Sequence, residues 1–230
     1  MFGLALSGGG TNFNLDDSLG SGESAMLQAA IYGRSDSDRA YVSGALAYGV
    51  HKMHTDRAVT FAGFDRFTAD FYTQNFAGDV EVGYKAGLLT PFAAVRGQVV
   101  STPGYQEETV SGASTFALGY EDQLEMAGRV EVGARADWSA DIDAGTLSAY
   151  TSLAVAHQFS TGNSVQAYFL ALPGATYTVS GAEPDATAVL MSLGTELRLD
   201  SGWSLSGGID AALTQNAQSY SGNARLGFKW

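Results

Sequence analysis

Apolar and polar residues alternate with a period of two over most of this 230-residue chain, and this pattern constrains the fold more than any other feature. Residues 126–138 show it fully, because Val130, Val132 and Trp138 share one parity while Arg129 and Glu131 share the other. A period of two belongs to β-strands that have one apolar and one polar face. It predicts an all-β chain of ten strands near residues 2–12, 23–34, 41–50, 79–85, 91–103, 126–138, 147–159, 187–199, 203–213 and 220–230.

These segments are close to the length of a membrane-spanning strand, which is about 9–11 residues. The polar faces carry charges among small neighbours, as in a crowded, wet barrel lumen, and aromatic residues gather near strand ends on the apolar faces, as in the girdles of membrane barrels. The girdle candidates are Tyr84, Phe92, Trp138, Phe159, Trp203, Phe228 and Trp230. We therefore predict an antiparallel transmembrane β-barrel, with a soluble β-sandwich as the alternative.

The connections between the predicted strands alternate in length. Long linkers are expected near 13–22, 52–65, 104–125 and 160–186, and shorter ones near 35–38, 88–90, 139–146 and 200–202. Outer-membrane barrels have long external loops and short periplasmic turns. This alternation places the C-terminus on the periplasmic side.

Composition excludes several functions. The net charge of −12 repels phosphate backbones, so no nucleic-acid partner is expected. The chain has no Cys, which excludes a thiolate site, and no apolar run reaches the roughly 18 residues of a transmembrane helix. His51 and His54 are expected in a loop, and His157 lies far from them in the sequence. We therefore expect no metal, no cofactor and no catalytic residue, and the protein is not expected to be an enzyme.

Charged residues on the polar faces are candidates to line the lumen. Carboxylates and arginines of opposite sign on neighbouring strands are expected to pair and fill the interior, with selectivity of a pore as the functional alternative. The candidates are Glu81, Arg96, Glu131, Arg135, Glu196, Arg198, Asp210 and Arg225.

Several motifs resemble those of a known family. Residues 78–85 (GDVEVGYK), 130–138 (VEVGARADW) and 172–190 (LPGATYTVSGAEPDATAVL) are similar to strand and loop motifs of the autotransporter translocator barrel, the C-terminal domain of type V secretion proteins. The segments 193–213 and 220–230 resemble its closing hairpin. The likeness extends over nearly the whole chain.

The resemblance implies a monomeric barrel in the cell outer membrane that anchors an N-terminal passenger and carries it to the cell surface. Its partners would be outer-membrane lipid, the passenger and the assembly machinery, which would read the terminal strand at Tyr220, Leu226, Phe228 and Trp230. A passive pore without a passenger and a soluble β-sandwich adhesin remain as alternatives. The resemblance does not identify the passenger.

The chain departs from the family pattern in its strand number. The family barrel has twelve strands and a lumenal helix, whereas residues 1–230 form one domain with about ten strands and no helical period near Met1. We expect the first strands, the helix and the passenger to lie outside this sequence, and these residues alone to transport little. Because an unpaired strand edge costs several kcal/mol per backbone group in hydrocarbon, Phe2–Asn12 should pair with Tyr220–Trp230 or stay strained.

Overall fold

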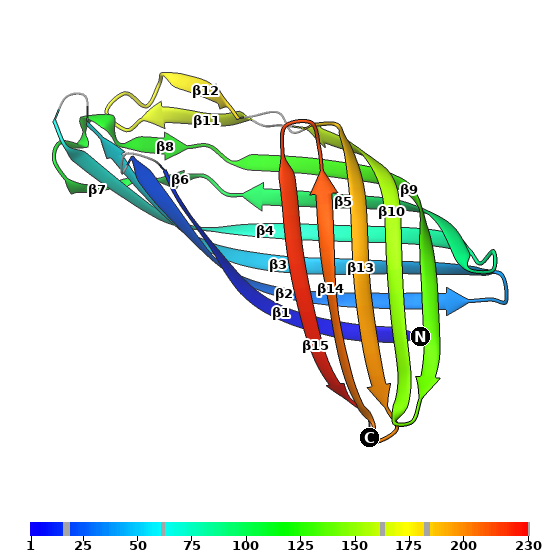
Figure 1. Ribbon diagram of the computed structural model, residues 1–230. Helices are drawn as coiled ribbons and strands as arrows, with labels where there is room; N and C mark the ends of the chain where they lie inside the picture. Colours follow the sequence, from blue (N-terminus) through cyan, green and yellow to red (C-terminus); the bar gives the residue numbers. More distant parts are fainter. Residues whose placement is uncertain (16–18, 61–62, 162–163, 182–184, 230) are drawn as a thin grey trace.

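The computed structural model describes residues 1–15, 19–60, 63–161, 164–181 and 185–229. Ten long strands form one antiparallel sheet in the order β1-β2-β3-β4-β5-β9-β10-β13-β14-β15 (Figure 1). The prediction of an antiparallel ten-strand β-fold is confirmed. The strands are β1 (Phe2–Asn14), β2 (Gly20–Asp36), β3 (Ala40–Val59), β4 (Asp65–Tyr84), β5 (Leu89–Thr102), β9 (Gln123–Ile142), β10 (Gly145–Thr161), β13 (Thr187–Leu199), β14 (Trp203–Leu213) and β15 (Gln218–Phe228).

A second, smaller sheet lies at one end of the first, at the upper left of Figure 1. It has the order β12-β11-β8-β6, and a further strand, β7, pairs with β4. We call these five strands the crown: β6 (Tyr105–Gln106), β7 (Glu108–Ser111), β8 (Leu118–Tyr120), β11 (Ser164–Phe169) and β12 (Thr176–Ser180). A short 3-10 turn, Ser114–Phe116, joins β7 to β8.

The two ends of the long sheet differ in their connections. At the turn end, the links 37–39, 85–88, 143–144 and 200–202 are tight, and at the loop end the chain makes its longer excursions, including the crown. The links 15–19 and 60–64 are shorter than the predicted 13–22 and 52–65, because β2, β3 and β4 continue further. No helix among the described residues has the length and apolarity needed to cross a membrane.

The two faces of the sheet differ in chemistry, as the alternation predicts. Large apolar side chains on one face are exposed, among them Leu153, Leu193 and Ile209. The opposite face holds the buried residues of the long strands, such as Ala94, Glu81 and Glu131. Among the described strands, no second sheet covers the apolar face, so the sandwich alternative is wrong.

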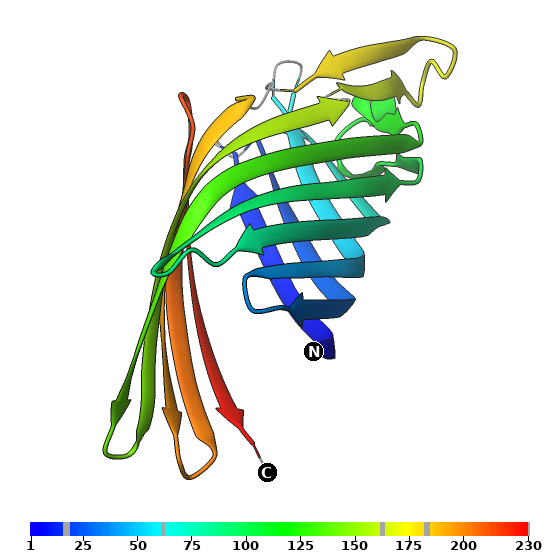
Figure 2. The ribbon, with the colours of Figure 1, turned by 90° about the vertical axis from the view of Figure 1, so that its right-hand side faces the viewer.

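The sheet curls into a half-barrel (Figure 2). In the described pairings, β1 joins only β2 and β15 joins only β14. The expected pairing of Phe2–Asn12 with Tyr220–Trp230 is therefore not present, and each edge strand keeps one free row of backbone groups.

The apolar band on the outward face is narrower than the strands are long. On β3 the outward positions Val42, Leu46 and Val50 are apolar, but Lys52 and Asp56 beyond them are polar. Strands β3 and β4 have 20 residues each, about twice what a bilayer requires. Their loop-end halves therefore project beyond the band, and β7 covers the β4 edge there by pairing with Phe67 and Thr68.

Candidate functional site: the concave face of the sheet

The charged side chains of the central strands lie on the concave face of the curl. Arg135 on β9 reaches Glu81 on β4, with an Nη2–Oε1 distance of 3.4 Å, although β5 lies between these two strands. Curvature brings the side chains of strands that are not neighbours closer together on the inner side of a sheet. This contact places both side chains on the concave face of the half-barrel (Figure 2), and the assignment of that face to a lumen stays a prediction.

A polar network crosses the concave face near the turn end. The Tyr41 hydroxyl donates a hydrogen bond to Glu81 Oε1 at 2.6 Å, and Arg135 donates to the Tyr41 hydroxyl at 3.3 Å. The Tyr41 ring lies over Gly83, where any Cβ would collide with it. The Arg135 guanidinium lies 5.4 Å from the centre of the Phe92 ring. These contacts connect β3, β4, β5 and β9 and fix the curl locally.

Phe92 corrects one sequence prediction. It was expected in the outward girdle, but it is buried beneath Arg135. The register places it opposite Gly83, on the face of Glu81. The preceding Pro91 is exposed, so the parity of β5 assigns Phe92 to the concave face.

A second cluster surrounds Glu131, whose side chain is only 4 % exposed. Arg96 Nε donates a hydrogen bond to Glu131 Oε1 at 2.7 Å. Arg129 Nε lies 2.7 Å from the same oxygen, but its N–H makes no hydrogen bond, so the contact is purely ionic. Arg96 and Arg129 stand directly opposite one another on β5 and β9. The carboxylate therefore neutralises two cations that would otherwise repel each other.

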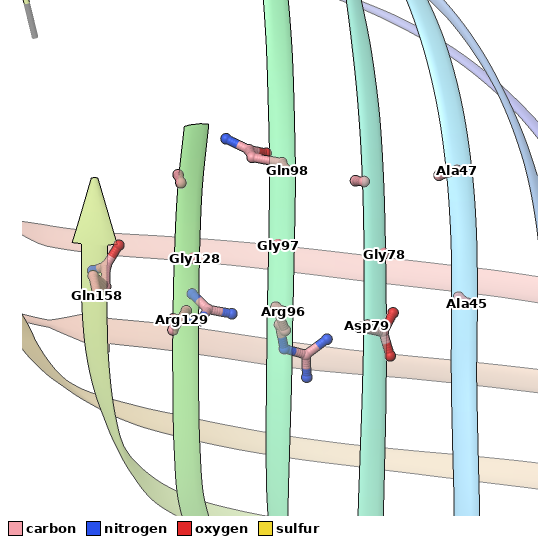
Figure 3. A pocket seen from close by; sticks show the side chains of 12 residues that line it. Ala45, Ala47, Gly78, Asp79, Arg96, Gly97, Gln98, Gly128, Arg129 and Gln158 are labelled. Carbon is pink, nitrogen blue, oxygen red and sulfur yellow. The ribbon is translucent and has the colours of Figure 1, made fainter. Parts of the chain in front are cut away.

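This cluster borders a hollow of about 330 Å³ on the concave face. Small residues on β3, β4, β5 and β9 form its floor, and Asp79, Gln98 and Gln158 add polar groups (Figure 3). The small floor residues are Ala45, Ala47, Ala77, Gly78, Gly97, Ala127 and Gly128. The hollow has room for several water molecules.

The remaining lumen candidates lie toward β15. Glu196 pairs with Arg198 on its own strand at 2.9 Å, and both side chains are exposed. Asp210 and Arg225 lie on the same face as Glu196, and no ion pair joins either of them within the described part of the chain. The eight candidates thus form two clusters around the buried carboxylates of Glu81 and Glu131 and one looser group toward β15.

The crown is anchored to the concave side of the loop end. Arg57 on β3 makes two hydrogen bonds to Glu107, of 2.8 and 2.6 Å, and a third to the Phe116 carbonyl oxygen. The Tyr105 ring stacks between Phe71 of β4 and Tyr120 of β8, at centroid distances of 3.8 and 4.5 Å. Burial raises the pKa of Tyr105 to about 12.

The histidines are placed differently from their prediction. His51 and His54 lie within β3 and not in a loop, because that strand extends to Val59. His54 contacts Asp70 at 3.2 Å and Asp56 at 3.5 Å on the projecting half of the sheet. No set of three or more metal-ligating side chains occurs among the described residues.

The terminal strand has the predicted parity. Tyr220, Leu226 and Phe228 are exposed, and Phe228 packs against Trp203 with ring centres 4.9 Å apart. Trp230 lies outside the described residues. The role of these residues in assembly stays a prediction.

Tyr41, Arg129 and Arg57 were not among the predicted site residues, although each has a partner on the concave side. The alternation of polar and apolar residues places Tyr41 and Arg129 on the polar faces of their strands, so the sequence pattern could have identified both as site residues. Arg57 could not be found in this way, because its partner Glu107 lies in a separate strand insertion whose position the sequence does not reveal.

The comparisons with known proteins agree with this architecture. The family model described as autotransporter beta-domain matches residues 1–210. The translocator domain of autotransporter NalP from Neisseria meningitidis superposes with a TM-score of 0.68 at 14 % identity, covering 92 % of this chain and 69 % of that one. The beta domain of the Bordetella autotransporter BrkA superposes with a TM-score of 0.62 at 16 % identity, covering 100 % of this chain and 92 % of that one. At such identities the two structures support the fold alone, and no curated protein sequence matches significantly.

Proposed function

The chain belongs to the autotransporter β-domain family, and from this premise we propose that its concave face is the path along which the passenger of the parent protein reaches the cell surface. A β-domain of this family is an outer-membrane translocator that anchors a passenger. The proposed function is therefore protein transport, and no residue is assigned a chemical reaction.

One observation supports the path most strongly, namely the opposite chemistry of the two faces. The outward side chains Leu153, Leu193 and Ile209 suit hydrocarbon, whereas Glu81, Glu131 and their arginine partners suit a wet interior. A polypeptide in transit needs hydrogen-bond partners that lipid does not offer. The concave face supplies them.

We further propose that the turn end, and with it the C-terminus, faces the periplasm. The loop end carries the crown and the projecting halves of β3 and β4, whose outward side chains Lys52, His54 and Asp56 are polar. Outer-membrane barrels place short turns in the periplasm and long loops outside. The crown would then stand on the cell surface, beside the exit of the path.

The transport proposal is tested in the parent protein, with its passenger and export signal. Deleting residues 1–230 should abolish cleavage of the passenger by protease added to intact cells, while the passenger remains detectable in lysed cells. Undiminished surface cleavage after the deletion would contradict the proposal. A steady ion conductance of the purified chain, without surface passenger, would favour a passive pore.

We propose that outer-membrane lipid and the assembly machinery are partners of β15. Leu226 is 69 % exposed on the outward face, while Asn223 lies on the concave side opposite Gly208. Replacing Leu226 by Arg should lower the free energy of unfolding in liposomes by up to about 2–4 kcal/mol, and by less if the position lies near the interface.

The matched control is Asn223→Arg on the same strand, which should be tolerated because that side chain faces the lumen. Both variants can be refolded into liposomes and titrated with urea. Equal tolerance of arginine at both positions would show that the faces of β15 are assigned wrongly.

A further inference from the structure

The outward face contains an unfilled groove of about 780 Å³ beside the edge strand β1. Such a volume lies within the range of small-molecule sites. Its walls are apolar side chains of four strands, each of them more than one-third exposed. These side chains are Phe2, Leu4, Ile31, Val42, Leu46 and Val80.

The groove exists because two glycines face each other within one row of the sheet. Phe2, Gly33, Gly44 and Val80 stand in register across β1, β2, β3 and β4. The Phe2 ring lies across Gly33, with ring atoms 2.8 Å from where a Cβ would stand. At Gly44 a Cβ would stand 2.9 Å from the Asp79 carbonyl oxygen, and the nearest side-chain atom is Val80 Cγ2 at 3.7 Å. At Gly44 the floor is therefore backbone, and the side chains of Phe2 and Val80 stand on either side of it in the same row.

We propose that this groove seats one acyl chain of a phospholipid of the periplasmic leaflet. The walls belong to the same exposed apolar band as the rest of the outward face, so the groove is continuous with the lipid-facing surface. Within a bilayer, apolar groups gain from contact only through packing, because lipid tails are as apolar as the protein. A chain lying in the groove touches both walls and the floor, whereas on a flat part of the convex surface it touches one side.

The position of the groove selects the leaflet. Val42 and Gly33 lie within a few residues of the 37–39 turn, at the turn end of the sheet. This choice rests on the proposed function, which places that end in the periplasm. Phospholipid is then the ligand, and the lipid A anchor of the opposite leaflet is not.

Native mass spectrometry of the detergent-purified full-length protein tests the proposal, with palmitoyl-oleoyl phosphatidylethanolamine as the added lipid. The wild type should retain one lipid more strongly than any further copies. Val42→Phe fills the groove from one wall without adding a new Cβ, and it should reduce retention of that lipid about tenfold, since the loss of about ten carbon contacts amounts to this factor.

The matched control is Val132→Phe, on the outward face of β9, where Val132 is 68 % exposed and does not line the groove. It should retain lipid as the wild type does. If Val42→Phe does not fold, Val80→Phe fills the groove from its β4 side. Unchanged retention in a folded groove variant would overturn the proposal, and equally strong retention of lipid A would overturn the choice of leaflet.

Surface cleavage of the passenger, measured in the same variants, separates this inference from the transport proposal. Val42→Phe should retain the lipid more weakly than the wild type and keep surface display of the passenger. Absence of the passenger from the surface of cells that make the wild-type protein would count against the transport proposal. The difference in lipid retention between the wild type and the groove variants would still test whether the groove binds lipid.

Discussion

Replacing Glu131 by Ala is expected to lower the free energy of unfolding by about 3 kcal/mol, near the low end for breaking a buried ion pair. Glu131 is 4 % exposed and contacts both Arg96 and Arg129, which stand directly opposite one another. Without the carboxylate, two like charges face each other across β5 and β9. The cost stays near the low end because both arginines are partly exposed to the lumen.

Glu196→Ala is the matched control, because Glu196 is also a carboxylate of the concave face. Its pair with Arg198 is exposed on both sides, so its loss should cost at most about 1 kcal/mol. Urea titration of both variants in the same detergent measures the difference. A cost at Glu196 as large as that at Glu131 would show that burial does not govern these pairs.

Replacing Arg57 by Ala should destabilise the crown by about 3 kcal/mol, since it leaves the carboxylate of Glu107 buried without its cation. The Glu107 side chain is 5 % exposed, and its other hydrogen bonds come from the Leu118 amide and the Tyr120 hydroxyl. The effect should be local. Hydrogen exchange should rise in residues 105–120 and remain unchanged in β13 and β14.

Two further variants separate charge from packing in the crown. Adding Glu107→Gln to Arg57→Ala removes the unpaired charge and should recover part of the lost protection. Arg66→Ala breaks an exposed pair with Asp56 nearby and should change exchange little. If the double variant exchanged as fast as Arg57→Ala, the buried charge would not be the cause.

The alternation of residues was sufficient to predict most of the long sheet. It identified ten strands and the two faces of the sheet. The faces are strongly specified, because a shift of one residue would turn every side chain of a strand to the other face and would place Glu131 and Arg135 in lipid. Strand ends were less predictable, and the projecting half of β3 was missed. Its outward residues there are Lys52, His54 and Asp56, whose polarity suggests a loop when no neighbouring strand is known.

The candidate site was predictable in its residue types but not in its partners. Parity assigns Glu81 and Arg135 to one face, but their contact across β5 depends on how tightly the sheet curls, which no local pattern encodes. The crown depends on contacts between distant segments, such as Phe71 with Tyr105. Such pairings arise from the tertiary fold, so only the structure shows them.

The central claim is that the convex face meets lipid while the concave face meets water, and fluorescent labels on single cysteines test it most directly. The chain contains no native Cys, so each label has a unique position. Leu153 and Leu193 are outward, and Ser152 and Ser192 are their concave neighbours on β10 and β13. In liposomes, nitroxide-bearing lipid should quench the labels at 153 and 193, and aqueous iodide should quench those at 152 and 192. If neither agent quenched the labels at positions 153 and 193, these side chains would be buried in a protein core, and this result would contradict the central claim.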